Sequence, residues 1–316
     1  MMKKAVSILI ILLLSMSVFG CNSAADKPTE KESTAASSVA ESSAAVTEET
    51  TVVSETEASA AESSIAETSD VASDSDSGDW AYIADKNEMI VGITYFEPMN
   101  YMDDSGDLTG FETEFTEAVC EILGVTPKFQ EINWNSKEIE LNAKSIDCIW
   151  NGMTITDERA ENMSISVPYM QNKQVLVVKS ENAASAADSM DGLVIVAEIE
   201  SAGEEVAMEE DFFQNAVYTS VDTQAKAIME VASGTADGCV IDYVTSIGMI
   251  GEGTDYADLV VVEELAFAEE EYGIAMRKTD VEFTAKINDA IKQLLDNGKL
   301  MEIAVKYELE DLLITK

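Results

Sequence analysis

The chain has 316 residues, enough for one or two domains, and its 61 acidic and 19 basic side chains give a formal net charge of −42. A chain this acidic is repelled by phosphate backbones, which argues against nucleic-acid binding. There is no histidine, which excludes Ser-His-Asp and Cys-His catalysis and histidine-ligated metals.

The N-terminus has the parts of a secretory signal. Residues 1–4 carry two lysines, and residues 5–19 are apolar but too few to span a bilayer. The run Val18-Phe19-Gly20-Cys21 resembles a bacterial lipoprotein signal. The resemblance implies that residues 1–20 are a signal peptide and that Cys21 becomes the lipidated N-terminus, anchored to the cell membrane outside the cytoplasm. The alternative is plain secretion with an unmodified Cys21.

Residues 21–78 differ in composition from everything that follows. They are rich in Ser, Ala, Thr and Glu and contain no aromatic residue. Such a segment cannot bury enough apolar surface to offset the entropy that ordering would cost. We therefore predict a disordered tether, with an end-to-end distance of about 40 Å, that holds a folded domain near the membrane.

Residues 79–316 alternate between strand and helix signals. Strands are predicted at 89–93, 125–132, 146–150, 173–179, 193–197, 237–241, 259–263 and 272–277, and helices at 111–123, 135–143, 223–232, 242–250 and 281–295. In the first helix, Phe111, Phe115, Val119, Ile122 and Leu123 are expected on one face, and Gly124 ends it. The alternation predicts an α/β fold with mostly parallel sheets.

Three cysteines fall in this folded part, Cys120, Cys148 and Cys239, and none forms a Cys-x-x-Cys pair. A zinc ribbon and a thioredoxin-like redox site are therefore excluded. Each cysteine lies in an apolar stretch, so we expect buried, unpaired thiols. A bridge between Cys120 and Cys148 remains an alternative.

The most informative segment is residues 151–159, with the sequence NGMTITDER. Thr156 can cap a short helix that begins at Asp157 and carries Arg159 in its first turn. Backbone N–H groups, the Thr154 hydroxyl and the guanidinium would then converge, as in a site for a carboxylate. The alternative is an exposed Arg159 that pairs with its acidic neighbours.

This segment and the motifs around it resemble the polar amino-acid-binding proteins of ABC importers, the family 3 solute-binding proteins. The other motifs are PMNY at 98–101, GDLTGF at 106–111, GEE at 203–205, VID at 240–242 and EYGIAMRK at 271–278. The resemblance implies a two-lobed periplasmic-binding-protein type II clamshell of the α/β class. Lobe one would comprise about 84–171 and 272–316 and lobe two about 172–271. Two crossover hinge strands, near 169–173 and 268–272, would join them.

The resemblance also implies a ligand site between the lobes. Phe96 and Trp134 match positions that stack on the ligand, and the backbone of Asn151 and Gly152 matches contacts to its head group. Thr154 and Arg159 match residues that bind the carboxylate, and Ser201 and Ala202 match a loop that binds it through backbone N–H groups. Asp242 matches the residue that pairs with the ammonium group. Phe96 and Trp134 could instead be core residues, and Asp242 a helix N-cap. The chain departs from the family pattern at Ile93, where an acid is common, and at Glu200, where glycine is usual.

The implied function is an extracytoplasmic, lipid-anchored receptor that binds a polar L-amino acid and delivers it to an ABC permease. It would act as a monomer without cofactor or metal and would not be an enzyme. The negative charge favours cationic ligands by steering, and Arg159, as the one basic group expected in the cleft, fits a ligand with one carboxylate. One alternative is a cyclohexadienyl-dehydratase-like enzyme with Glu97, Glu198 or Glu200 as general acid. Another is a sensory receptor for a separate signalling partner.

Overall fold

The structure is a computed structural model that describes residues 79–265, 267 and 269–316. The predicted signal peptide, Cys21, the tether and Ala268 lie outside the described residues. The helices in the described part are α1 (Asp79–Lys86), α2 (Phe111–Leu123), α3 (Lys137–Asn142), α4 (Asp157–Asn162), α5 (Ala183–Asp188), α6 (Ala202–Glu209), α7 (Gln224–Ser233), α8 (Tyr243–Met249), α9 (Val281–Asp296) and α10 (Lys299–Lys306). None of them is long and apolar enough to cross a membrane.

The strands are β1 (Glu88–Ile93), β2 (Tyr101–Met102), β3 (Leu108–Thr109), β4 (Thr126–Glu131), β5 (Cys148–Thr154), β6 (Met163–Ile165), β7 (Met170–Lys179), β8 (Val194–Glu198), β9 (Val217–Val221), β10 (Gly238–Asp242), β11 (Leu259–Val261) and β12 (Glu269–Arg277). Each predicted strand and helix is present, with ends shifted by a few residues. Strand β9 was not predicted because it lies at the sheet edge with most of its side chains exposed or half-exposed, so its apolar pattern is weak.

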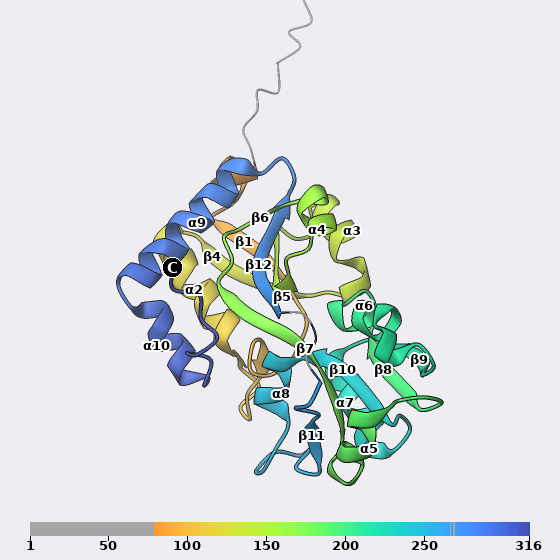
Figure 1. Cartoon of the computed structure of the whole chain (residues 1–316). Coiled ribbons are helices and arrows are strands. Elements are labelled where there is room, and N and C mark those ends of the chain that lie inside the picture. The colour runs from red at the N-terminus through yellow and green to blue at the C-terminus, as the bar shows by residue number, and fades with distance from the viewer. Residues whose placement is uncertain (1–78, 266, 268) are drawn as a thin grey trace, which may run out of the picture. The chain divides into compact units, whose positions relative to one another are not determined.

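The main sheet runs in the order β4-β1-β5-β12-β7-β10-β8-β9 and joins two lobes (Figure 1). Strand β7 is common to both. Its first residues pair antiparallel with β12, from Met170 opposite Tyr272 to Lys173 opposite Glu269, and its later residues pair with β10, from Gln174 opposite Asp242 onward. One continuous strand therefore crosses from one lobe to the other, which fits the two-lobed fold.

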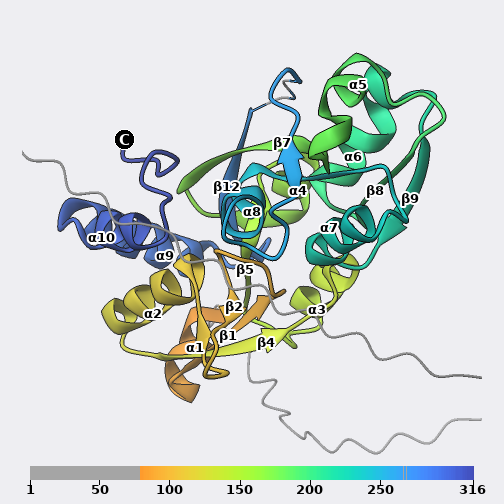
Figure 2. The same ribbon diagram turned by 90° about the horizontal axis from the view of Figure 1, so that it is seen from below.

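Helices cover both faces of the sheet in each lobe. In lobe one, α2, α9 and α10 pack on one face and α3 on the other (Figures 1 and 2). In lobe two, Val175 and Val177 of β7 face the cluster that contains α7, whereas Leu176 and Val178 face the cluster that contains α5 and α6. This burial on both faces explains the near-continuous apolar runs by which the sequence predicted the strands.

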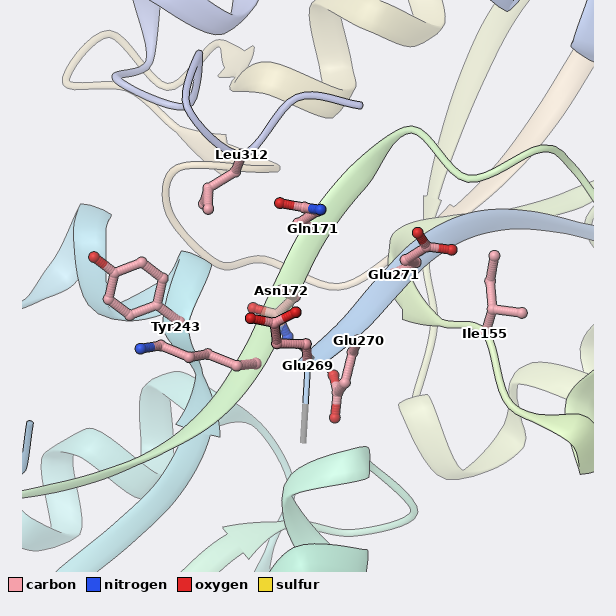
Figure 3. A pocket seen from close by; sticks show the side chains of 9 residues that line it. Ile155, Gln171, Asn172, Tyr243, Glu269, Glu270, Glu271 and Leu312 are labelled. Carbon is pink, nitrogen blue, oxygen red and sulfur yellow. Dashed lines mark hydrogen bonds between the residues drawn. The ribbon is translucent and has the colours of Figure 1, made fainter. Parts of the chain in front are cut away.

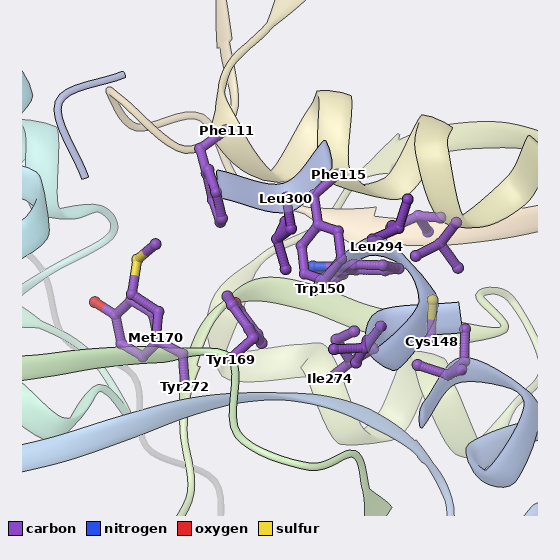
Figure 4. Packing of buried hydrophobic residues seen from close by; sticks show 14 of the residues in the cluster. Phe111, Phe115, Cys148, Trp150, Tyr169, Met170, Tyr272, Ile274, Leu294 and Leu300 are labelled. Atoms are coloured by element: carbon purple, nitrogen blue, oxygen red, sulfur yellow. The ribbon is translucent and has the colours of Figure 1, made fainter. Parts of the chain in front are cut away.

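An aromatic cluster fixes the lobe-one core beside β5. Phe115 of α2 meets the Trp150 ring edge-on, with 4.8 Å between ring centroids, and also packs against Tyr169 (Figure 4). Ile122 of the same helix is exposed, so its expected place on the buried face is wrong. Gly124 ends α2 in the left-handed conformation, as predicted.

The three cysteines are buried and unpaired, so the alternative Cys120–Cys148 bridge is not formed. Burial raises the pKa of the Cys120 thiol to about 12 and raises that of Cys148 well above its usual value. A thiol needs to be a thiolate to react, so these groups act as packing residues.

Of the two arginines, Arg277 serves the core of lobe one. It is buried, and its guanidinium is surrounded by three carboxylates and two backbone carbonyls: Asp79, Asp147, Asp280 and the carbonyl oxygens of Leu141 and Ile146. It ties the start of α1 to the end of β12 and to the segment before β5.

We expect Arg277→Met to lower the free energy of unfolding by about 3–5 kcal/mol, because it removes the cation shared by three buried carboxylates. Asp79 and Asp147 keep a lysine each, whereas Asp280 keeps no ion-pair partner among the described residues. Lys292→Ala is the control, since Lys292 forms an exposed pair with Asp296 and should contribute less than about 1 kcal/mol. Urea unfolding followed by circular dichroism compares the two. Equal losses would contradict the assigned role of Arg277.

Candidate ligand-binding site

An irregularity in β5 shapes the lobe-one side of the site. Met153 lies opposite Gly273 of β12 and Ile149 opposite Ala275, so residues 150–152 face a single residue of the partner strand. The strand therefore bulges at Gly152, which has a φ of +55°. Bulges of this kind redirect the backbone next to binding sites.

Buried polar groups hold the bulge. The Asn151 Oδ1 atom accepts from the Thr94 N–H at 2.7 Å, and its Nδ2 donates to the Thr94 hydroxyl at 2.7 Å. The Gly152 N–H donates to Glu112 at 2.8 Å, and Tyr169 donates to the same carboxyl oxygen. Burial raises the pKa of Glu112 to about 7. Because the Asn151 side chain is used in this way, its backbone is the part left for a ligand.

Arg159 is placed by a capped helix. The Thr156 hydroxyl accepts from the Arg159 N–H at 3.2 Å at the start of α4, as the sequence predicted. The side chain is buried, with Nη1 donating to the Thr154 carbonyl at 2.8 Å and Nη2 to the Glu200 carbonyl at 3.3 Å. The alternative of an exposed Arg159 paired with acidic neighbours is therefore wrong.

The facing part of lobe two is the loop between β8 and α6. Ser201 caps α6, with its hydroxyl accepting from the Glu204 N–H at 3.1 Å. Gly203 allows the helix start to approach β10, since a Cβ there would lie 2.8 Å from the Val240 carbonyl oxygen. The backbone N–H groups at 202 and 203 thus belong to a buried helix N-terminus, which favours anions.

The carbonyl oxygen of Glu200 links the two lobes. It accepts from Trp134 Nε1 at 3.1 Å, from Lys137 Nζ at 3.3 Å and from Arg159 Nη2 at 3.3 Å. Glu200 has a φ of +56°, unusual for a residue with a side chain, and this explains why glycine is common here in the family pattern. Three donors from lobe one therefore close on one oxygen of lobe two.

Asp242 is surrounded by amide donors. Its carboxylate accepts from Asn172 at 2.8 Å, from Gln174 at 2.5 Å and from Gln224. It occupies the N-cap position of α8 but makes no side-chain cap bond, so the cap alternative is wrong. Burial raises the pKa of Asp242 despite these hydrogen bonds.

Glu270 of β12 lies beside the same amides. Its carboxylate accepts from the Thr154 hydroxyl at 2.9 Å and from Asn172 and Gln174 at 3.1 Å each. Burial, and next the charge of Asp242, raise its pKa. A ligand cation near these groups would relieve the repulsion between the two carboxylates.

Eight of the nine residues proposed from the sequence line one cavity, which both lobes enclose. Its lining is Trp134, Asn151, Gly152, Thr154, Arg159, Glu198, Ser201, Ala202, Gln224 and Asp242. The cavity volume is about 10 Å³, room for about one water molecule. Phe96 is the residue not brought to it. Its ring packs in the lobe-one core against Gly152, where an added Cβ would lie 3.0 Å from Phe96 Cζ.

A larger hollow, about 580 Å³, lies along the two paired crossing strands (Figure 3). It is lined by Ile155, Gln171, Asn172, Lys173, Tyr243, Glu269, Glu270, Glu271 and Leu312. None of the nine proposed residues lines it. The small cavity is the better candidate site, since buried donors and acceptors converge there from both lobes.

Sequence reasoning missed three groups at the site. Glu198 was named only as a possible general acid, and neither Gln224 nor Lys137 was named. Arg159 is the one basic residue that lines the cavity, as expected, and Lys137 lies beside it. Lys137 is buried beside the cleft, 3.5 Å from the Glu200 carboxylate and 4.8 Å above the Trp134 ring. Glu198 had a readable signal, because it ends β8 as Asp242 ends the parallel strand β10, and such strand ends meet at one edge.

Comparison with known proteins agrees with this geometry. Residues 89–310 match the model of the bacterial extracellular solute-binding proteins, family 3. The chain belongs to this family. The L-cystine-binding protein TcyJ of Escherichia coli K12 is 28% identical over 243 residues, covering 75% of this chain and 88% of the relative.

Two solved structures extend the comparison. A substrate-binding protein of an ABC uptake transporter from Streptococcus pneumoniae, with bound histidine, matches at a TM-score of 0.68 and 30% identity, covering 75% of this chain and 98% of that one. An ancestral amino-acid-binding protein, described as a precursor of cyclohexadienyl dehydratase, matches at a TM-score of 0.64 and 28% identity. The match covers 73% of this chain and 99% of that one. Family 3 proteins are extracellular binding proteins with the type II clamshell fold, as the sequence led us to expect.

We expect Gly152→Ala to destabilise the fold more than Gly124→Ala. Both glycines have a positive φ, 55° and 71°, so both changes carry a backbone cost of about 1–2 kcal/mol. Only at Gly152 would the new Cβ crowd Phe96, whereas nothing lies within 4 Å at Gly124. Overpacking should add about 1–3 kcal/mol. Matching melting temperatures for the two variants would show that the bulge is not packed as described.

Proposed function

We propose that this protein is a solute receptor that binds a polar L-amino acid between its lobes and delivers it to an ABC permease. The observation that carries the proposal is the convergence of Arg159 and Thr154 from one lobe with Ser201, Ala202 and Asp242 from the other on a single buried cavity. Donors for a carboxylate and an acceptor for an ammonium group are what the head group of an amino acid requires.

In this proposal the ligand carboxylate binds Arg159, the Thr154 hydroxyl and the N–H groups at the start of α6. Its ammonium group binds Asp242 and the backbone at 151–152. Charge-assisted hydrogen bonds contribute about 1.5–3 kcal/mol each, so four of them supply about 6–12 kcal/mol before ordering costs. Micromolar affinity requires about 8 kcal/mol, so the site suffices for binding in that range. The stacking roles of Trp134 and Phe96 remain predictions.

Ligand entry requires the lobes to separate. The cavity holds about one water molecule, and an amino acid is several times larger. Because Glu200 and Arg159 bond directly across the cleft, we propose that the ligand carboxylate replaces the Glu200 carbonyl as a partner of Arg159. Closure around the ligand is then favoured because both lobes bind it only when closed.

Delivery and anchoring are the finer parts of the proposal. The histidine-bound relative is named as part of an ABC uptake transporter, which supports a permease partner for this chain. Cys21 lies outside the described residues, and its lipidation rests on the signal-like sequence alone.

We expect Cys21→Ser to move the protein from the membrane fraction to the soluble or secreted fraction, because the acyl chains are the only anchor proposed for it. Fractionation with immunoblotting measures the shift, and Ser23→Ala serves as a neighbouring control. A Cys21→Ser protein that stays with the membrane would disprove lipid anchoring at this residue.

The dehydratase alternative has one observation in its favour. Of the three acids considered as general acid, Glu97 and Glu200 are exposed, whereas Glu198 lines the cavity, and burial raises the pKa of Glu198 to about 8. A protonated carboxyl is what a general acid requires. The ancestral relative, however, is itself named as an amino-acid-binding protein. Turnover of prephenate or arogenate by the purified chain is the measurement that would favour this alternative.

We expect Arg159→Ala to weaken amino-acid binding by at least about 100-fold, since it removes two charge-assisted hydrogen bonds to the carboxylate. Isothermal titration calorimetry of the full chain against the amino acids that shift its melting temperature provides the measurement. Lys292→Ala removes one positive charge far from the cavity and should bind normally. An Arg159→Ala variant with unchanged affinity would refute the site.

A further inference from the structure

The cavity contains one buried group that the amino-acid head group does not use. Glu198, at the end of β8, is about 5% exposed and lines the cavity. Within the described residues its Oε1 atom is buried and has no hydrogen-bond partner. Most buried polar atoms in proteins are paired, and an unpaired one is costly. A buried, unpaired carboxyl oxygen at a ligand cavity therefore calls for a donor on the ligand.

The charges around the cavity indicate what kind of donor. Arg159 is the one cation among the lining residues, while Glu198 and Asp242 are both acids. Glu270 adds a third carboxylate, which shares the Asn172 and Gln174 amides with Asp242. Arg159 and Asp242 balance the two charges of a zwitterionic head group. The remaining acid, Glu198, is available to the ligand's side chain.

Lys137 does not cancel this excess. Its Nζ atom donates to the Glu200 carbonyl, lies 3.5 Å from the Glu200 carboxylate and sits above the Trp134 ring. It is therefore engaged with Glu200 and the Trp134 ring, and Lys137 is not among the residues that line the cavity. Its charge lowers the pKa of Glu198 without supplying a hydrogen bond.

We propose that Glu198 is a specificity-determining residue that pairs with a cationic side chain, and that the ligand is a basic amino acid of the lysine or arginine class. This inference rests on the proposed function and adds the substrate class. Family membership does not decide it, because relatives in this family are named for cystine, histidine and glutamine as well as for arginine.

The protonation state of Glu198 supplies a second signature. Burial, and next the charge of Asp242, raise its pKa to about 8, so without ligand the carboxyl is protonated at pH 7. A cationic side chain favours the ionised form, so binding should release a proton. Affinity for a basic ligand should then rise between pH 6 and pH 8.5. Asp242, Glu270 and Lys137 also face this region, and a Glu198→Gln variant separates their titration from that of Glu198.

The test is isothermal titration calorimetry of the full chain with L-arginine, L-lysine and L-glutamine, in two buffers of different ionisation enthalpy. We expect arginine or lysine to bind at least 10-fold more tightly than glutamine, with proton release at pH 7. Glu198→Gln should weaken binding of the basic ligand by about 10–100-fold, leave glutamine within about 3-fold and abolish the proton release. Glu209→Gln is the matched control, because it removes one carboxylate from the exposed end of α6.

Three results overturn the inference. Glutamine binding as tightly as the basic ligands would exclude a cationic subsite while leaving the amino-acid receptor intact. A Glu198→Gln variant that keeps its folded melting behaviour and its full preference for arginine or lysine would exclude Glu198 as the selecting group. Failure of every amino acid to bind the wild-type chain would overturn both this inference and the proposed function.

Discussion

Strand β7 (Met170–Lys179) belongs to both lobes, and both the fold and the site depend on that. Its first residues complete the lobe-one sheet beside β12, and its later residues lie within the lobe-two sheet beside β10. Asn172 and Gln174 stand on either side of this change of partner, and both donate to Asp242 and to Glu270. The proposed ammonium site is therefore built on the strand that crosses between the lobes, at the point where its pairing partner changes.

The chain uses its two arginines for separate purposes. Arg277 neutralises a buried cluster of carboxylates and holds α1, β12 and the start of β5 together. Within the part of the chain that the structure describes, the Arg159 guanidinium donates to two backbone carbonyls, one from its own lobe and one from the other. A guanidinium with five donors and no carboxylate partner among these contacts is suited to an anionic ligand. Although the protein is strongly acidic, this arrangement leaves the Arg159 guanidinium available to an anionic group in the cleft.

The Glu200 carbonyl of lobe two is the acceptor for three hydrogen bonds from lobe one. Trp134, Lys137 and Arg159 all donate to this oxygen, so hydrogen bonds to one carbonyl supply part of the contact between the lobes. Apolar packing supplies another part, since Val244 of α8 lies in the lobe-one core. Each such hydrogen bond contributes about 1 kcal/mol net or somewhat more where a charge is involved. A ligand carboxylate offers Arg159 a stronger partner than a carbonyl does. In the proposed function, the ligand would therefore replace the Glu200 carbonyl as the partner of Arg159.

The sequence alone determined the α/β class, the order of most elements, the capped turn at Thr156 and the glycine end of α2, because these depend on residues a few positions apart. The resemblance carried by residues 151–159 placed eight residues that line one cavity. Only the tertiary structure decided that Phe96 packs in the core, that Lys137 is buried beside the cleft and that the Glu200 carbonyl faces lobe one. It also left the Oε1 atom of Glu198 without a hydrogen-bond partner among the described residues. Those outcomes depend on contacts between residues such as Trp134 and Glu200, which are 66 positions apart. Such distant groups are paired by the packing of the lobes, and the local sequence pattern does not encode that packing.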